Sequence, residues 1–259
     1  PYTDELATDT LVCCVLNPLS SRRIYVRHDP SPCMTAVGVD WASGCWVVVV
    51  YDGDDVTITT EPAILNVWRE YGRGADAVLV DIPIGLPETA PRACDRAAAS
   101  VLGERHSSVF DVPCRAAVEA DGYEAARAAN GGRLGSQSWG LVPRIREVDC
   151  FLDAHGTEGR VYESHPEVCY AAFAARTDGD DPGSKREAEG QDARLAILDA
   201  VDEGFGAAVR AFVEDRRADP QWHHRIQSGR LDDVLDAAVL ALTAKEGSFG
   251  VLPAGRDAD

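Results

Sequence analysis

Five acidic side chains stand where apolar segments end or begin, which is where a carboxylate most needs a partner. A carboxylate at the end of a buried strand costs several kcal/mol, roughly, unless it is paired or bound to a cation. Several carboxylates within a few Å of one another cannot all stay ionised unless a cation lies among them. The candidates for catalysis and for metal binding are Asp40, Asp81, Glu163, Asp233 and Asp236.

The chemistry of such a site follows from its oxygen ligands. Carboxylate oxygens are hard donors, so they select Mg²⁺ or Mn²⁺ over zinc. Two such ions about 4 Å apart activate a water molecule and stabilise the leaving oxygen of a phosphodiester. The alternative for Asp40 is structural, because it precedes the turn at 42–44 and is suited to capping that turn. The alternative for Glu163 is an ion pair with an arginine of the segment before it.

Five further polar side chains are candidates for binding the substrate. Lys185 is suited to neutralising a phosphate, although a solvated lysine in the first turn of a helix has the same sequence signature. His165 is either a general base or phosphate contact, or a hydrogen-bonded residue of a turn before proline. Arg92, Arg115 and Gln137 are candidates to line the cleft, or else form ordinary surface contacts.

The elements expected to position these residues form an α/β pattern. Three β-branched apolar runs joined by short turns predict an antiparallel meander, and a helix over 62–71 leads to a fourth strand parallel to the first. The predicted mixed five-stranded sheet has the order 3-2-1-4-5. Strands one, four and five then end at one edge, where open α/β sheets place their sites. The expected strands are Val37–Val39, Cys45–Tyr51, Val56–Thr60, Ala77–Val80 and Arg160–Glu163.

Helices are expected to flank this sheet. Ser184 and Glu187 have the spacing of a capping box at the start of one of them. The segment 103–115 is expected to be a loop. The expected helices are Arg92–Leu102, Tyr123–Asn130, Pro143–Leu152, Glu167–Ala175, Ser184–Val201, Ala207–Arg216 and Leu231–Leu242.

The last of these helices has acids and apolar residues on the same side. Leu231, Val234, Leu235, Ala238 and Leu242 form one apolar face. Asp233 and Asp236 share the opposite side, but Leu240 makes that side apolar one turn further on. The pattern predicts a helix that lies against the sheet and is covered elsewhere too. Its acids are therefore expected to reach the site of Asp40 and Asp81, while Asp232 needs only its place near a helix N-terminus.

The composition is strongly acidic, with 43 Asp and Glu against 25 Lys and Arg and a formal net charge of −18. Lysine occurs only at Lys185 and Lys245, so 23 of the basic residues are arginine. This pattern is typical of a protein from a high-salt cytoplasm, and the alternative is an ordinary acidic protein. Screening at ~1 M salt reaches only about 3 Å, so nucleic-acid binding there rests on local contacts.

The remaining composition bears on location. The eight cysteines show no CxxC and no zinc-ligand spacing, so free thiols are expected and a disulfide-linked partner is not. There is no signal peptide and no apolar run near 18 residues, so no membrane association is expected. The expected location is cytoplasmic.

Several motifs together resemble one known family. They include the first strand with Asp40, DIPIGLP at 81–87, YESHPE at 162–167 and DDVLDAAVLA at 232–241, with RxCD at 92–95, SSVF at 107–110, SQ at 136–137 and SK at 184–185. From about Thr35 to Lys245 the chain resembles the domain-of-unknown-function family numbered 429, whose members are described as predicted nucleases with a ribonuclease-H-like fold. The DxxD of Asp233 and Asp236 also resembles the last helix of Holliday-junction resolvases. The resemblance implies a fold and a reaction class, not a substrate.

The domain boundaries follow from these elements. Residues 34–247 are expected to form one ribonuclease-H-like domain with a helical insertion at 88–158. Residues 1–33 show no clean periodicity and are expected to be a disordered extension before Met34, the only methionine and the expected native start; a genuine N-terminal arm is the alternative. Residues 248–259 are expected to be a frayed tail.

Three functions are open at this point. The first is a metal-dependent nuclease that hydrolyses phosphodiester bonds of DNA or RNA by two-metal-type activation of water. The second is a non-catalytic binding or scaffold domain on the same fold. The third is an actin-like ATP-dependent phosphotransferase, which also begins with a strand, an Asp and a turn, but this chain lacks its Gly-rich loop. Metal-binding calorimetry separates the second from the others, and ATP dependence identifies the third.

Overall fold

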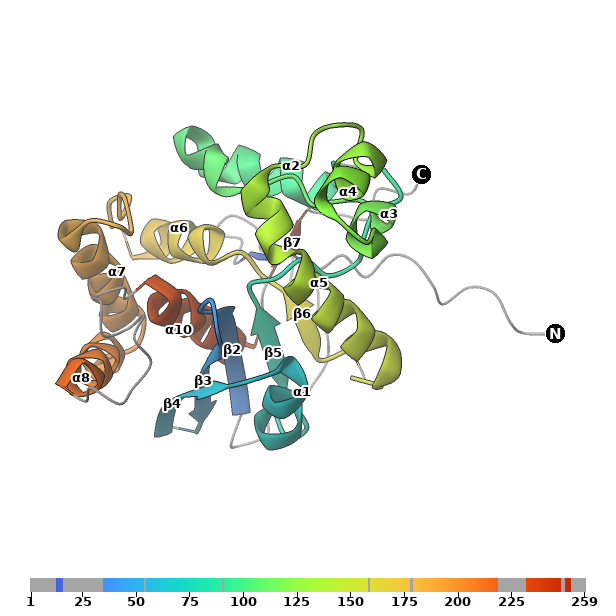
Figure 1. The fold of residues 1–259 in the computed structure, drawn as a ribbon. Coiled ribbons are helices and arrows are strands. Elements are labelled where there is room, and N and C mark those ends of the chain that lie inside the picture. Colours follow the sequence, from blue (N-terminus) through green and yellow to red (C-terminus); the bar gives the residue numbers. More distant parts are fainter. Residues whose placement is uncertain are drawn as a thin grey trace.

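The structure is a computed structural model that describes residues 13–15, 35–53, 55–89, 91–157, 159–177, 179–218, 232–247 and 250–252. Its centre is a five-stranded sheet of order β4-β3-β2-β5-β6, which is the predicted order 3-2-1-4-5 when strands are counted from β2 (Figure 1). The predicted α/β class and strand order are therefore confirmed. The strands are β2 Thr35–Trp41, β3 Trp46–Asp52, β4 Asp55–Glu61, β5 Ala77–Val80 and β6 Val161–Glu163.

The strand directions bring three of the acidic strand ends to one edge. β2, β3 and β4 form the antiparallel meander, with Asp40 opposite Val47. β5 is parallel to β2, and β6 is parallel to β5. Since parallel strands finish at the same edge of a sheet, Asp40, Asp81 and Glu163 all lie along it.

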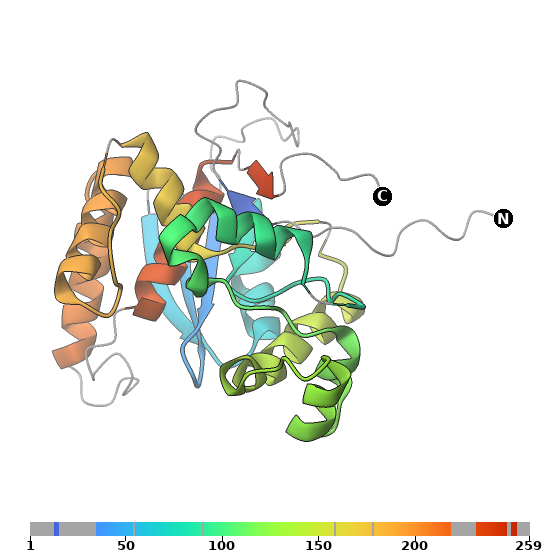
Figure 2. The same cartoon turned by 90° about the horizontal axis from the view of Figure 1, so that it is seen from above.

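Each face of the sheet carries its own apolar core. On one face, α10 (Asp232–Lys245) and α6 (Pro166–Arg176) pack on the sheet, with α7 (Ala188–Val201) and α8 (Phe205–Ala218) beside them (Figures 1 and 2). On the other face lie α1 (Ile64–Val67), which continues as the π-helical turn η1 (Trp68–Gly72), and α5 (Ser136–Ala154). Side chains alternate along β2, so Ala36 faces the α10 core while Val37 and Val39 face the α5 core.

The helical insertion lies between β5 and β6. It contains α2 (Ala93–Leu102), the 3₁₀ helix η2 (Gly103–Ser108), α3 (Arg115–Glu119), α4 (Tyr123–Ala129) and α5. The expectation of a plain loop over 103–115 is wrong, because η2 occupies its first part. Helix α5 begins at Ser136 and holds Pro143 in its interior, so the predicted start at Pro143 is also wrong.

The predicted capping box at Ser184 does not form. Helix α7 begins at Ala188, and its N-cap Glu187 makes no side-chain capping bond. Instead, the Ser184 hydroxyl accepts a hydrogen bond from the Arg186 backbone N–H at 3.4 Å, and the Ser184 carbonyl accepts one from the Glu187 N–H at 3.1 Å. Lys185 therefore lies in a turn before the helix rather than in its first turn.

A second, two-stranded sheet joins the two ends of the chain. Strand β1 (Cys13–Val15) pairs antiparallel with β7 (Gly250–Leu252). The expectations of an unpaired segment at 1–33 and of a frayed tail at 248–259 are wrong at these residues, because their partner is remote in sequence. The rest of 1–34, with the expected start at Met34, and residues 253–259 lie outside the described residues.

Two further observations bear on the environment. Within the described segments, no helix combines the length and apolarity needed to span a membrane. The five cysteines between residues 35 and 177 have free thiols, and all but Cys150 are buried. They are Cys45, Cys94, Cys114, Cys150 and Cys169.

Candidate metal centre

Three carboxylates from three different elements meet at the carboxyl edge of the sheet. Asp40 lies on β2, two residues after Gly38, and Asp81 directly follows β5. Asp236 comes from α10, which packs against both strands. One carboxylate oxygen of each of these residues lies within 4.8 Å of the other two. The predicted convergence of Asp40, Asp81 and the last helix is thus present in the structure.

The donor set fits a hard divalent cation. Ligands on opposite sides of one Mg²⁺ lie about 4.2 Å apart, so small side-chain rotations let one ion contact all three residues. Asp236 is only 1% exposed, and its Oδ1 has no hydrogen-bond partner within the described residues. A buried carboxylate oxygen without a donor is costly. A bound cation would supply the missing interaction.

The electrostatics of the cluster point the same way. Burial raises the pKa of Asp40 well above its ordinary value, and the charge of Asp81 raises it further. Burial, followed by the charge of Asp236, raises the pKa of Asp81 to about 8. Burial also raises the pKa of Asp236, against the lowering influence of Lys185. Each of these carboxyls resists ionisation in the metal-free protein, so a cation would stabilise their ionised forms.

Asp40 also makes a structural contact. Its Oδ1 accepts a hydrogen bond from the Trp41 backbone N–H at 2.6 Å. The structural role considered for Asp40 is therefore present in part. Because this bond uses Oδ1, Oδ2 of Asp40 remains available to the cluster, and the residue is 7% exposed.

Helix α10 is buried on all sides over nearly its whole length. Every residue from Asp233 to Ala244 is buried, which confirms that the helix is covered beyond its sheet-facing side. Asp233 is 5% exposed and near enough to raise the pKa of Asp40, but it does not belong to the three-carboxylate group. Asp232 is half-buried at the helix start, and Leu231 lies outside the described residues.

Glu163 is held by an arginine instead of joining the cluster. Its Oε1 accepts from Arg92 Nη2 at 2.5 Å, and its Oε2 accepts from Arg92 Nη1 and the Ile84 N–H, both at 2.7 Å. Arg92 also pairs with Asp95. Glu163 lies opposite Val80, which faces the α5 core, so Glu163 is on the face of the sheet away from α10. Glu163 is therefore not one of the three clustered carboxylates. The predicted alternative, an ion pair with an arginine of the insertion, is present instead.

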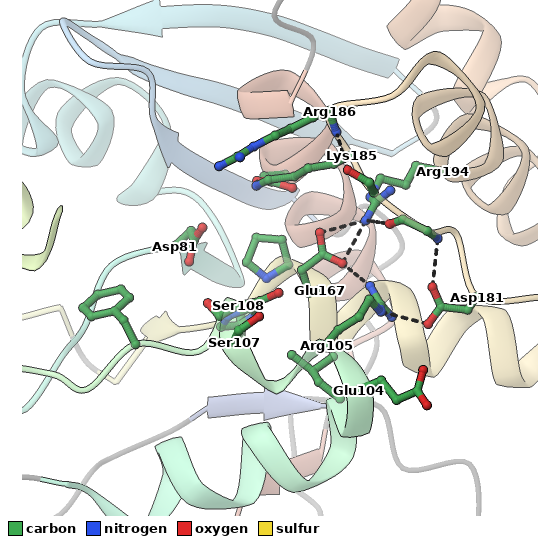
Figure 3. A pocket seen from close by; sticks show the side chains of 17 residues that line it. Asp81, Glu104, Arg105, Ser107, Ser108, Glu167, Asp181, Lys185, Arg186 and Arg194 are labelled. Carbon is green, nitrogen blue, oxygen red and sulfur yellow. Dashed lines mark hydrogen bonds and ion pairs between the residues drawn. The ribbon is translucent and has the colours of Figure 1, made fainter.

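A cavity of about 910 Å³ opens beside the cluster, with Asp81 and Asp236 in its wall. Figure 3 shows Lys185 and Arg186 entering it from the turn before α7, with Ser107 and Ser108 coming from η2. Lys185 Nζ donates to the Oδ2 of Asp236, and the Lys185 side chain is 35% exposed. Lys185 is thus at the site, as predicted.

Of the other four residues predicted to bind the substrate, one lines the cavity and three do not. His165 lines the cavity, and its Nε2 lies 3.3 Å from the Ser108 carbonyl oxygen. Arg92 is buried and forms ion pairs with Asp95 and Glu163. Arg115 pairs with Asp149 at 2.9 Å and Gln137 is exposed on α5, and neither lines the cavity. Arg115 and Gln137 are predicted to bind substrate only because they belong to the insertion. The insertion extends well beyond the site, so belonging to it does not place a residue there.

Sequence reasoning missed the arginines on the far wall of the cavity. Buried Glu167 accepts hydrogen bonds from Arg194 at 2.8 and 2.9 Å and from Arg105, and Arg105 also pairs with Asp181 at 2.8 Å (Figure 3). Arg194 further donates to the Gly183 carbonyl at 3.1 Å and so fixes the turn that carries Lys185. Glu167 belongs to the YESHPE motif, but nothing distinguishes Arg105 or Arg194 among 23 arginines.

Fold and site together define an α/β domain with a carboxylate-rich edge whose donor set fits a cation. Comparison with known proteins agrees with this class at the level of the family. Residues 38–258 match the family described as "Protein of unknown function (DUF429)", and the chain belongs to that family. No curated protein and no solved structure matches the chain.

Proposed function

We propose that the protein is a metal-dependent nuclease that hydrolyses phosphodiester bonds of nucleic acid at the cluster of Asp40, Asp81 and Asp236. The observation that carries the proposal is the buried Oδ1 of Asp236, which has no hydrogen-bond partner among the described residues and belongs to a group of three converging carboxylates. This group borders a cavity that also holds cationic side chains. A divalent cation, Mg²⁺ or Mn²⁺, would act there as a Lewis acid on a phosphoryl oxygen and lower the pKa of water.

The residues around the cluster have complementary roles in this reaction. The water oxygen forms a bond to phosphorus while the bond from phosphorus to the leaving sugar oxygen breaks, and a proton passes from the water to a base. His165 is the candidate base: Nε2–H donates to the Ser108 carbonyl, and Nδ1 is a buried acceptor with no hydrogen-bond partner among the described residues, so a side-chain movement would have to bring it to the water. Burial lowers the pKa of His165, so its imidazole is neutral near pH 7.

The cationic side chains of the cavity support nucleic acid as the substrate class. Lys185, Arg186 and Arg105 line it, although the whole chain carries a net charge of −18. Arg186 is exposed and lines the cavity (Figure 3). Its guanidinium is suited to contact a phosphate of the nucleic-acid backbone. Local pairs of this kind persist at high salt better than long-range attraction does.

Activity on a panel of labelled nucleic acids tests the proposal. Single-stranded and duplex DNA and RNA would be incubated with Mg²⁺ or Mn²⁺ in molar KCl. Cleavage of at least one substrate is expected. The cleavage rate should fall at least ~10²-fold in Asp40→Asn and in Asp236→Asn. Asp232→Asn is the matched control, because Asp232 lies outside the cluster, and it should keep nearly full activity.

The outcomes separate the alternatives. Metal binding without cleavage of any member of the panel would contradict the nuclease and favour a binding or scaffold domain. Cleavage or phosphate transfer that requires ATP would favour the actin-like phosphotransferase. Equal activity in Asp40→Asn and the unaltered protein would place the chemistry elsewhere.

A further inference from the structure

We propose that the centre holds one divalent cation, with the Lys185 ammonium in the place where a two-metal site has its second positive charge. The inference rests on the proposed metal site, but it concerns the number of ions and not the substrate. Its basis is the way the described side chains share the carboxylate oxygens of the cluster.

Few carboxylate oxygens remain for a second ion. Oδ2 of Asp236 accepts a hydrogen bond from Lys185, so only Oδ1 is free of hydrogen bonds to the described residues. Asp40 gives Oδ1 to the Trp41 N–H. A pair of ions about 3.5–4 Å apart needs bridging carboxylates and further ligands for each ion. One Mg²⁺, by contrast, is commonly held by one or two carboxylates and keeps several waters.

Glu163, the other strand-end carboxylate of this edge, is occupied by an arginine. Both oxygens of Glu163 accept hydrogen bonds from Arg92, whose side chain is 1% exposed. An arginine fork on a carboxylate is a strong, geometrically fixed pair, and removing one partner of a buried pair is costly. Glu163 is therefore unavailable to a second ion at this edge.

Charge balance agrees with a single ion. When ionised, the three carboxylates of the cluster, with the Lys185 ammonium and one divalent cation, sum to zero; Asp233, which is near Asp40 but outside the group of three, is not counted. A second divalent cation would leave the centre with two excess positive charges unless the ammonium left. The ammonium is also a compact point charge, which suits it to a place beside an ion better than a planar guanidinium. This gives a reason for lysine at a position of a chain that otherwise uses arginine almost throughout.

Counting bound Mn²⁺ in the full-length, chelator-treated protein tests the inference. Titration calorimetry, with free Mn²⁺ followed by electron paramagnetic resonance, should give one ion per chain. Lys185→Met should gain a second binding event, because the variant frees Oδ2 of Asp236. Lys245→Met is the matched control: it removes the only other lysine, which pairs with Asp202, and should keep one ion.

Each outcome decides the matter. Two ions in the unaltered protein would overturn the inference, and so would a Lys185→Met variant that still binds a single ion. No bound ion would overturn the metal site itself. One bound ion without cleavage of any nucleic acid would refute the proposed function and leave this inference standing, whereas two ions with cleavage would do the reverse.

Discussion

Gly38 on β2 and Ala237 on α10 approach so closely that a Cβ at Gly38 would lie 2.1 Å from the Ala237 carbonyl oxygen. It would also lie 2.2 Å from the Ala241 backbone nitrogen. Both obstacles are backbone atoms, so a side-chain rotation cannot relieve the clash. The absence of a side chain at Gly38 thus lets α10 reach the strand, and this contact places Asp236 beside Asp40.

Gly38→Ala should therefore separate the helix from the sheet. We expect the free energy of unfolding to fall by at least about 2 kcal/mol, the scale of overpacking in a core. Mn²⁺ affinity should fall more than stability alone explains, because the cluster is pulled apart. Chemical denaturation and calorimetry on the same samples measure both quantities.

Gly140→Ala is the control for this substitution. A Cβ at Gly140 meets nothing within 4 Å, and alanine is the better residue inside a helix such as α5. This variant should be as stable as the unaltered protein or more so. Equal stability of the Gly38→Ala and Gly140→Ala variants would mean that the close approach does not hold the site together.

Removing one carboxylate should stabilise the metal-free protein. Asp40→Asn replaces a buried carboxyl whose pKa is raised by burial and by the charges of Asp81 and Asp236, so unfolding at pH 8 should cost at least about 1 kcal/mol more. Asp202→Asn is the control and should lower the free energy of unfolding, because Lys245 and Tyr51 both donate hydrogen bonds to the Asp202 carboxylate. Thermal melts in chelator measure both variants. A much lower melting temperature for Asp40→Asn would show that its bond to Trp41 is its main role.

The stability of the metal-free protein should fall as the pH rises. The folded-state pKa of Asp81 is about 8, above its ordinary value of 3.8, so the folded state holds the proton more tightly than the unfolded chain. The resulting stability is fully present below about pH 4 and is lost as the pH rises through about 8. Melts in chelator from pH 5 to pH 9 should show this decline.

The same melts in Asp81→Asn serve as the comparison. That variant should show a flatter dependence, and saturating Mg²⁺ should flatten it in the unaltered protein, since the ion binds the ionised carboxylates. Parallel slopes for the two proteins in chelator would mean that Asp81 does not titrate in this range.

Stability should also rise with salt. At a net charge of −18 the surface repels itself in dilute buffer, and molar KCl screens that repulsion. We expect a melting temperature several degrees higher in ~2 M KCl than in dilute buffer. A melting temperature that does not change with KCl would contradict the high-salt origin predicted from the composition.

The local patterns of the sequence determined the strands, their order and three of the metal-binding candidates. The β-branched runs before Asp40 and Asp81 predict strands with acidic ends, and a helix between them requires a parallel pairing. The apolar surroundings of Asp236 along its own helix likewise predict a covered acid. These conclusions need only the periods of helix and strand, which are properties of neighbouring residues.

Tertiary structure decided which acids meet and what neutralises them. Glu163 ends a strand at the same edge as Asp81, but it points to the opposite face and is held there by Arg92. Lys185 reaches Asp236 only because the turn before α7 folds over the cluster. β1 and β7 pair across nearly the whole length of the chain. Contacts of this kind depend on distances between residues remote in sequence, and no local period carries that information.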